Sequence, residues 1–163
     1  MSLNSLEDLL TEQLQDLYSA EVQFAEAQPK MAEAASDDAL RDALETHLEV
    51  TRGQVARLEQ VAKVLGVNLQ GKTCHAARGL VREGQETVAQ EGDPFVKDAA
   101  LIAAAQRIEH YEIAGYGTVC AFAKRLGYKE AERLLQETLA EERGADMLLN
   151  ELAEGSINRE AAS

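Results

Sequence analysis

The sequence has few of the residues on which sheet proteins depend. It contains two prolines and no tryptophan, and aromatic residues make up only 4% of its 163 residues. Alanine, leucine and glutamate are abundant instead, and these are strong helix formers. This composition predicts an all-α protein rather than a β-sheet protein. At this length we expect one domain with a core of its own.

Cysteine is also scarce, and the two that occur, Cys74 and Cys120, lie far apart. Two distant cysteines form neither a metal knuckle nor a disulfide framework. The sequence lacks an apolar run of about 18 residues, the length of a membrane span. It also lacks a charged-then-apolar signal leader. We therefore expect a cytoplasmic protein with no membrane partner.

Positive charge is the third deficiency: 16 Lys and Arg accompany 29 Asp and Glu, giving a formal net charge of −13. Nucleic acids and anionic lipids are bound by clustered Lys and Arg, so we expect neither as a partner. An acidic pocket would attract cations instead. Most of the acids are expected to cover helix surfaces and to aid solubility.

Hydrophobic periodicity predicts four long helices and one shorter helix. They are expected at residues 5–35, from the polar turn 36–38 to 65, at 74–90 (the short helix), at 94–126, and from the turn 127–129 to about 154. Short turns join antiparallel neighbours, and a long connection separates the two helical hairpins. We therefore predict a ferritin-like antiparallel four-helix bundle whose long crossover contains the extra short helix. The predicted domain spans residues 1–155, and residues 156–163 are expected to form a frayed tail.

Two of the long helices carry a glutamate in a stripe that is otherwise apolar or small. In the third long helix Glu112 follows Ile108, and in the first Glu21 precedes Phe24. A buried carboxylate is costly unless it is paired or binds a metal. The two acids therefore indicate either a metal site or a polar core.

The turns predict which of these acids lie at the same height. Antiparallel helices both rise about 1.5 Å per residue, so residues equally far from their turn face each other. Glu112 and Glu142 lie 15 residues before and after Gly127 (127 − 112 and 142 − 127). Glu21 lies 15 residues before position 36 (36 − 21), and Thr51 lies 15 after it (51 − 36). We expect three carboxylates and one threonine at a common level.

Further candidate ligands lie one turn from this level. Glu109 shares a helix face with Glu112. His47 lies one turn before Thr51 and can supply an imidazole. Glu141 would be the inward-facing acid in place of Glu142 if the last helix is rotated by one position. The candidate metal ligands are Glu21, His47, Glu109, Glu112 and Glu142.

The set departs from a complete ferritin-type site. Di-iron and di-manganese bundle sites use one Glu from each of two helices and Glu-x-x-His from each of the other two. Glu21 and Glu112 match the single-glutamate positions. Thr51 and Gln54 stand where the second helix should carry its pair, and Ala145 stands where the last helix should carry its histidine. Carboxylate oxygens suit Fe or Mn, but the loss of both imidazoles weakens a redox centre.

Several strings of the sequence resemble those of the YciF-like bacterial stress proteins. They are Leu17–Glu21, His47–Leu58, Asp98–Gln106, Glu109–Ala114 and Glu137–Glu142, within a similarity that extends from about Ser5 to Ala153. The resemblance implies a ferritin-like fold akin to rubrerythrin and manganese catalase, a homodimer and a role in stress. Rubrerythrin-type sites also carry Glu-x-x-Glu on the third helix, which Glu109 and Glu112 match.

Two functions fit these residues. The leading hypothesis is a stress protein whose carboxylates hold one or two Fe or Mn ions that react with peroxide or oxygen if the site is redox-active. The alternative is a non-catalytic structural or interaction bundle, in which the acids form a hydrogen-bonded polar core with His47, Tyr18 and Gln54. Whether the protein is an enzyme stays open. The expected partners are metal ions and a second copy of the chain.

Overall fold

The computed structural model describes residues 3–163, and helices account for almost all of them. The elements are α1 (Leu6–Ala34), α2 (Asp38–Leu65), α3 (His75–Ala89), α4 (Pro94–Leu126), α5 (Lys129–Leu152), the π-helical turn η1 (Ala153–Ile157) and α6 (Asn158–Ala161). No strand occurs within these described residues. Within the same range, no helix has both the length and the apolar character needed to cross a membrane.

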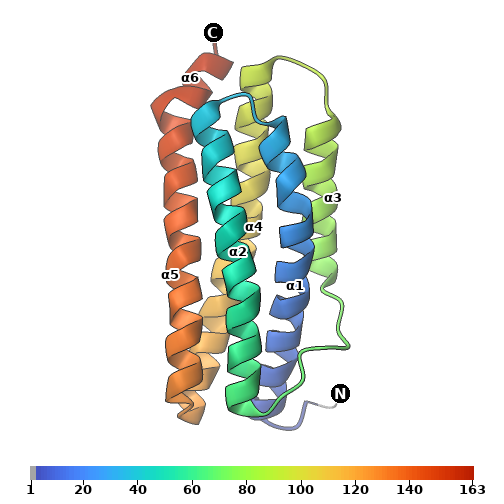
Figure 1. The fold of residues 1–163 in the computed structure, drawn as a ribbon, viewed down its shortest axis with the longest axis vertical. Coiled ribbons are helices and arrows are strands. Elements are labelled where there is room, and N and C mark those ends of the chain that lie inside the picture. Colours follow the sequence, from blue (N-terminus) through green and yellow to red (C-terminus); the bar gives the residue numbers. More distant parts are fainter. Residues whose placement is uncertain (1–2) are drawn as a thin grey trace.

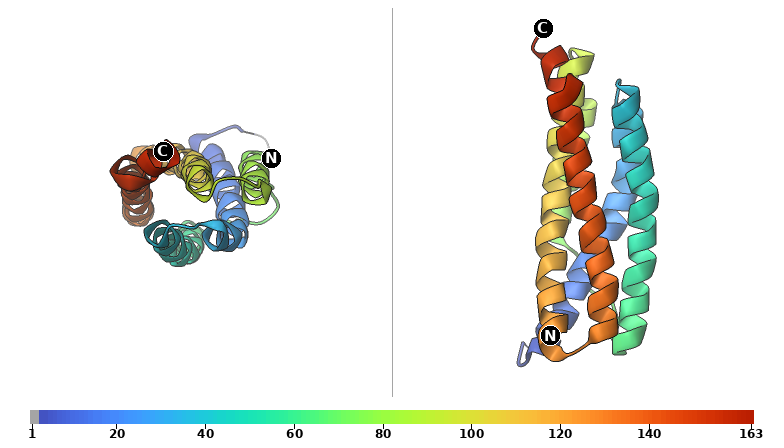
Figure 2. Two further views of the ribbon diagram at one scale, coloured as in Figure 1. Left: turned by 90° about the horizontal axis from the view of Figure 1, so that it is seen from above. Right: turned by 90° about the vertical axis from the view of Figure 1, so that its left-hand side faces the viewer.

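Four of the helices, α1, α2, α4 and α5, form an antiparallel bundle (Figure 1). Each packs on two neighbours, in the order α1, α2, α5, α4 and back to α1. The additional helix α3 lies outside the bundle against α1 and α4, as the view along the bundle axis shows (Figure 2). The predicted four-helix bundle with a helix-containing crossover is therefore confirmed.

The helix ends follow the signals in the sequence. Ser5 caps α1 by accepting a hydrogen bond from the Asp8 amide at 3.1 Å. The αL glycine Gly127, with φ of 75°, ends α4 and allows the tight turn into α5. A buried carboxylate of α4, Asp98, accepts hydrogen bonds from the Ser36 and Asp37 amides, both at 2.8 Å. These contacts fix the heights of the helices relative to one another.

The hydrophobic core is divided into two clusters. One includes Phe24, Leu44 and Leu101 and lies toward the α1–α2 turn. The other includes Leu14 and Val119 and lies toward the α4–α5 turn. The four buried glutamates, Glu21, Glu109, Glu112 and Glu142, occupy the level between these clusters, so apolar side chains cover them on both sides along the bundle axis.

The C-terminal segment differs from the prediction. Residues that were expected to fray continue the last helix as η1 and α6. Ile157 is only 1% exposed and belongs to the first cluster. The frayed tail predicted from residue 156 is therefore wrong for this stretch, because the chain still has an apolar side chain to bury.

Candidate metal centre

Four side chains from three helices converge between the two clusters. They are His47 of α2, Glu109 and Glu112 of α4, and Glu142 of α5, and one ligand atom from each lies within 4.8 Å of the others. All three carboxyl groups are buried, whereas His47 keeps 12% of its side chain exposed. The equal spacing of Glu112 and Glu142 from Gly127 accounts for their common height.

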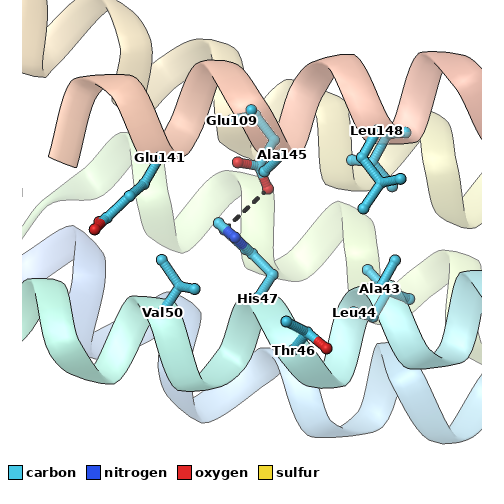
Figure 3. A pocket seen from close by; sticks show the side chains of 11 residues that line it. Ala43, Leu44, Thr46, His47, Val50, Glu109, Glu141, Ala145 and Leu148 are labelled. Atoms are coloured by element: carbon cyan, nitrogen blue, oxygen red, sulfur yellow. Dashed lines mark ion pairs between the residues drawn. The ribbon is translucent and has the colours of Figure 1, made fainter. Parts of the chain in front are cut away.

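His47 lies beside two of the acids. Its Nε2 is 3.3 Å from Glu109 Oε1 and 3.6 Å from Glu142 Oε2, and the close-up shows the ring directed at Glu109 (Figure 3). Burial lowers the pKa of His47 below its ordinary value, although the charge of Glu142 opposes this. The neutral imidazole that results is the form that ligates a metal.

The carboxyl groups of α4 are short of partners. Among the described residues, neither oxygen of Glu112 has a hydrogen-bond partner, and the same holds for Oε2 of Glu109. Burial raises the pKa of both groups well above the usual range, and the charge of Glu142 adds to this. An unpartnered buried polar group costs about 1–3 kcal/mol, so these oxygens fit a cation better than they fit an empty core.

Glu21 of α1 stands apart from the four converging groups. Its Oε1 accepts a hydrogen bond from the hydroxyl of Tyr116, while Oε2 has no partner in the described chain. Burial raises the pKa of Glu21 to about 8, the Tyr116 hydroxyl lowers it, and the charge of Glu142 raises it. The charge of Glu21 in turn raises the pKa of Glu112, so the two acids belong to one electrostatic unit.

Tyr116 was not predicted as a site residue. It follows Glu112 by four residues and therefore shares its helix face, which is the signal that was available. Tyr18, which was predicted to join a polar core with the central acids, lies elsewhere. Tyr18 donates to Glu59 at 3.1 Å, and Tyr111 donates to Asp16. The predicted participation of Tyr18 in a polar core with the central acids is therefore wrong.

Thr51 lies on α2 at the level of the central acids, and its hydroxyl group already makes two hydrogen bonds. It donates to the His47 carbonyl at 3.1 Å and accepts from Gln28 Nε2 of α1 at 3.1 Å. These bonds connect α1 to α2 beside the centre, so Thr51 has a structural role.

The last helix presents Glu142 inward, so the alternative register with Glu141 inward is wrong. Gln54 Nε2 donates to Glu142 Oε1, and also to Glu141 Oε2 at 3.1 Å. Arg57 binds Glu141 with two hydrogen bonds of 2.7 and 2.8 Å. Gln54 therefore occupies a histidine position of the ferritin pattern but acts as a donor to a candidate ligand.

A pocket of about 220 Å³ between α2 and α5 reaches this centre. Its polar lining residues are His47, Glu109, Thr46 and Glu141, and Ala145 lies next to His47 and Glu109 (Figure 3). The short Ala145 side chain stands where a ferritin-type helix would place a second imidazole, and space is present there instead.

Comparison with known proteins agrees with this architecture. Residues 5–162 match the family described as "Domain of unknown function (DUF892)". Protein YciF of Escherichia coli K12 is 43% identical over 162 residues, which cover 99% of this chain and 98% of that protein. The crystal structure of the E. coli stress protein YciF matches with a TM-score of 0.92 over 95% of this chain and 98% of that one.

Two further solved structures are similar. YcfI, a proposed structural protein from Rhodopseudomonas palustris, is 45% identical with a TM-score of 0.88, over 91% of this chain and 95% of that one. A protein from Xanthomonas campestris is 21% identical with a TM-score of 0.72, over 93% and 92% of the two chains, and shares the fold alone. The chain therefore belongs to the DUF892 family, as a relative of the bacterial stress protein YciF.

Proposed function

We propose that this protein is a metal-binding stress protein that holds Fe or Mn in the core of its bundle. His47, Glu109, Glu112 and Glu142 would hold one ion, and Glu21 would join Glu112 in holding a second. The observation that carries the proposal is the convergence of four ligand atoms within 4.8 Å. Several oxygens in this set lack any other partner among the described residues.

The donor set and its charge suit this assignment. Carboxylate oxygens with a single imidazole favour Fe or Mn over softer metals, which select thiolates. The four buried glutamates, when ionised, balance two divalent ions. A single divalent ion balances two of them, and raised pKa values allow the others to keep their protons.

Fe or Mn held in this way would supply redox chemistry with peroxide or oxygen. The chain contributes orientation and shielding. Gln54 fixes the carboxylate of Glu142, and Tyr116 fixes that of Glu21. The two apolar clusters exclude water along the bundle axis. His47, which is partly exposed, lies on the side where small molecules can approach.

A non-catalytic structural bundle is the second candidate. Hydrogen bonds join α1 to α2 through Gln28 and Thr51, and α2 to α5 through Gln54 and Arg57. Such a network fixes the register of the helices. The description of the relative YcfI as a proposed structural protein favours the same alternative.

Metal analysis of the purified protein, combined with thermal unfolding, separates the two candidates. We expect bound Fe or Mn, and a higher melting temperature when Mn(II) is added after chelation. An ion at about 100 times its Kd stabilises the native state by about 2.7 kcal/mol. Glu112→Ala should lose this response. Glu45→Ala, which removes an exposed acid of α2, should keep it.

A wild-type protein that is metal-free and gains no stability from Mn(II) or Fe(II) would contradict the proposal and leave the structural bundle. If metal binds, peroxide consumption by the metal-loaded protein distinguishes an enzyme from a binding protein. The Glu112→Ala variant serves as the blank in that assay.

A further inference from the structure

The pocket between α2 and α5 has mostly apolar walls and a polar floor. Its walls are mostly apolar, formed by Ala43, Leu44, Val50, Ala145, Leu148 and Leu149, and Thr46 and Glu141 also line it. His47 and Glu109 form the floor (Figure 3). A site with apolar walls and a few convergent polar groups is typical of a small-molecule pocket.

Small residues on α5 create the space. Gly144 and Ala145 face α2 across the pocket, and a longer side chain at Ala145 would enter it. The opening is therefore encoded in the residues of α5 and does not require movement of either helix.

In the protein without a bound ion, the floor has an unused hydrogen-bond acceptor. Glu109 is only 3% exposed, and its Oε2 has no partner among the described residues. The His47 Nε2 beside it also lacks a bond of proper geometry within that part of the chain. An occupant that brings one hydroxyl group to this floor would satisfy a buried group that is otherwise unpaired.

The volume of the pocket and the charge around it limit which molecules it can bind. A cavity of about 150 Å³ accommodates benzene, and this pocket measures about 220 Å³. It therefore admits one ring or a short branched chain with a small substituent. Anionic ligands are disfavoured, because the floor lies among four buried carboxyl groups in a protein of net charge −13.

We propose that this pocket binds a small alkyl or monocyclic aryl molecule that carries one neutral hydroxyl group. The apolar part lies between Val50, Ala145 and Leu148, and the hydroxyl donates to Glu109. This site goes beyond the proposed metal binding and does not require an ion, so the two proposals can fail separately.

The test compares three probes of similar size on the full-length, chelator-treated protein by calorimetry and NMR. Benzyl alcohol should bind about tenfold or more tightly than toluene, because only the alcohol satisfies Glu109. Benzoate should not bind measurably. Benzyl alcohol should shift the resonances of Ala43, Ala145 and Leu148 rather than those of the distant α4–α5 turn, a readout that needs no variant.

A matched pair of variants locates the site. Ala145→Leu fills the pocket and should weaken benzyl alcohol binding at least tenfold. Ala140→Leu makes the same change at an exposed position of α5 and should leave binding unchanged. Equal affinities for the two variants, or resonance shifts outside the pocket, would overturn the proposal. Binding that appears only when the protein is diluted would also overturn it, because a second copy of the chain would then cover the pocket.

Discussion

The buried carboxyl of Glu21 makes a quantitative prediction for the metal-free protein. Its pKa is about 8 in the folded chain, against an ordinary value of 4.5, chiefly because of burial. Between these two pH values the unfolded chain releases a proton that the folded chain keeps. The folded state therefore loses stability relative to the unfolded state as pH rises through this window.

The magnitude follows from the shift. A single group of this kind lowers the free energy of unfolding by about 1.4 kcal/mol per pH unit, and by about 5 kcal/mol over the full interval. His47 acts in the opposite direction, because its lowered pKa makes stability rise with pH, but only up to its ordinary value of 6.5. The interval from pH 6.5 to 8 thus isolates the buried acids.

The variant Glu21→Gln removes this titration. Its slope of unfolding free energy against pH should be less negative than that of the wild type by about 1.4 kcal/mol per pH unit. Guanidinium unfolding with EDTA, followed by circular dichroism at several pH values, measures both slopes.

The control is Glu26→Gln, which changes an exposed acid of the same helix. It should reproduce the wild-type slope. If Glu21→Gln also has the wild-type slope, Glu21 is not the buried proton-holding group described above, and the electrostatic account of the centre fails.

Four further variants test contacts within and between the helices. A Cβ at Gly115 would lie 2.6 Å from Cδ2 of the buried Leu17, so Gly115→Ala should cost about 1–3 kcal/mol in urea unfolding. Gly117→Ala meets nothing within 4 Å among the described residues and should stabilise by about 0.5–1 kcal/mol. Asp98→Ala leaves two amides of the α1–α2 turn without their acceptor and should cost about 2 kcal/mol by the same assay. Arg57→Leu removes both hydrogen bonds to a partly exposed carboxylate of α5, and thermal unfolding should show a loss of about 0.5–1 kcal/mol.

Much of the fold could be read from the sequence because its signals are local. The Ser5 cap and the glycine that ends α4 mark helix ends, and apolar periodicity marks the buried faces. Equal distances from a turn then place Glu112 opposite Glu142, since both helices rise at the same rate.

The partners of the acids were harder to predict, because they depend on the reach of long side chains between helices. Tyr116 lies one turn beyond the acidic level, yet its hydroxyl extends back to Glu21. Arg57 similarly extends from α2 to Glu141, the acid of α5 that is not directed into the core. Spacing along one helix gives the height of a Cα atom but not the direction of a flexible side chain.

The departures from the ferritin pattern bear differently on the two candidate functions. A purely structural polar core accounts for Thr51 and Gln54, since both make hydrogen bonds between helices. It does not account for Glu112, which is 1% exposed and whose oxygens accept no hydrogen bond from an amide or hydroxyl group of the described chain. In a core without metal, an apolar side chain of similar size at this position would make the protein more stable by several kcal/mol. It would avoid the cost of burying an unpaired polar group, and it would add the gain from burying apolar surface. The departures from the ferritin pattern remove the two expected histidines, and His47 supplies one imidazole from a neighbouring turn. The carboxyl groups, whose burial is costly, are kept. That combination is expected of a core that binds a cation, and it is why we favour the metal-binding function.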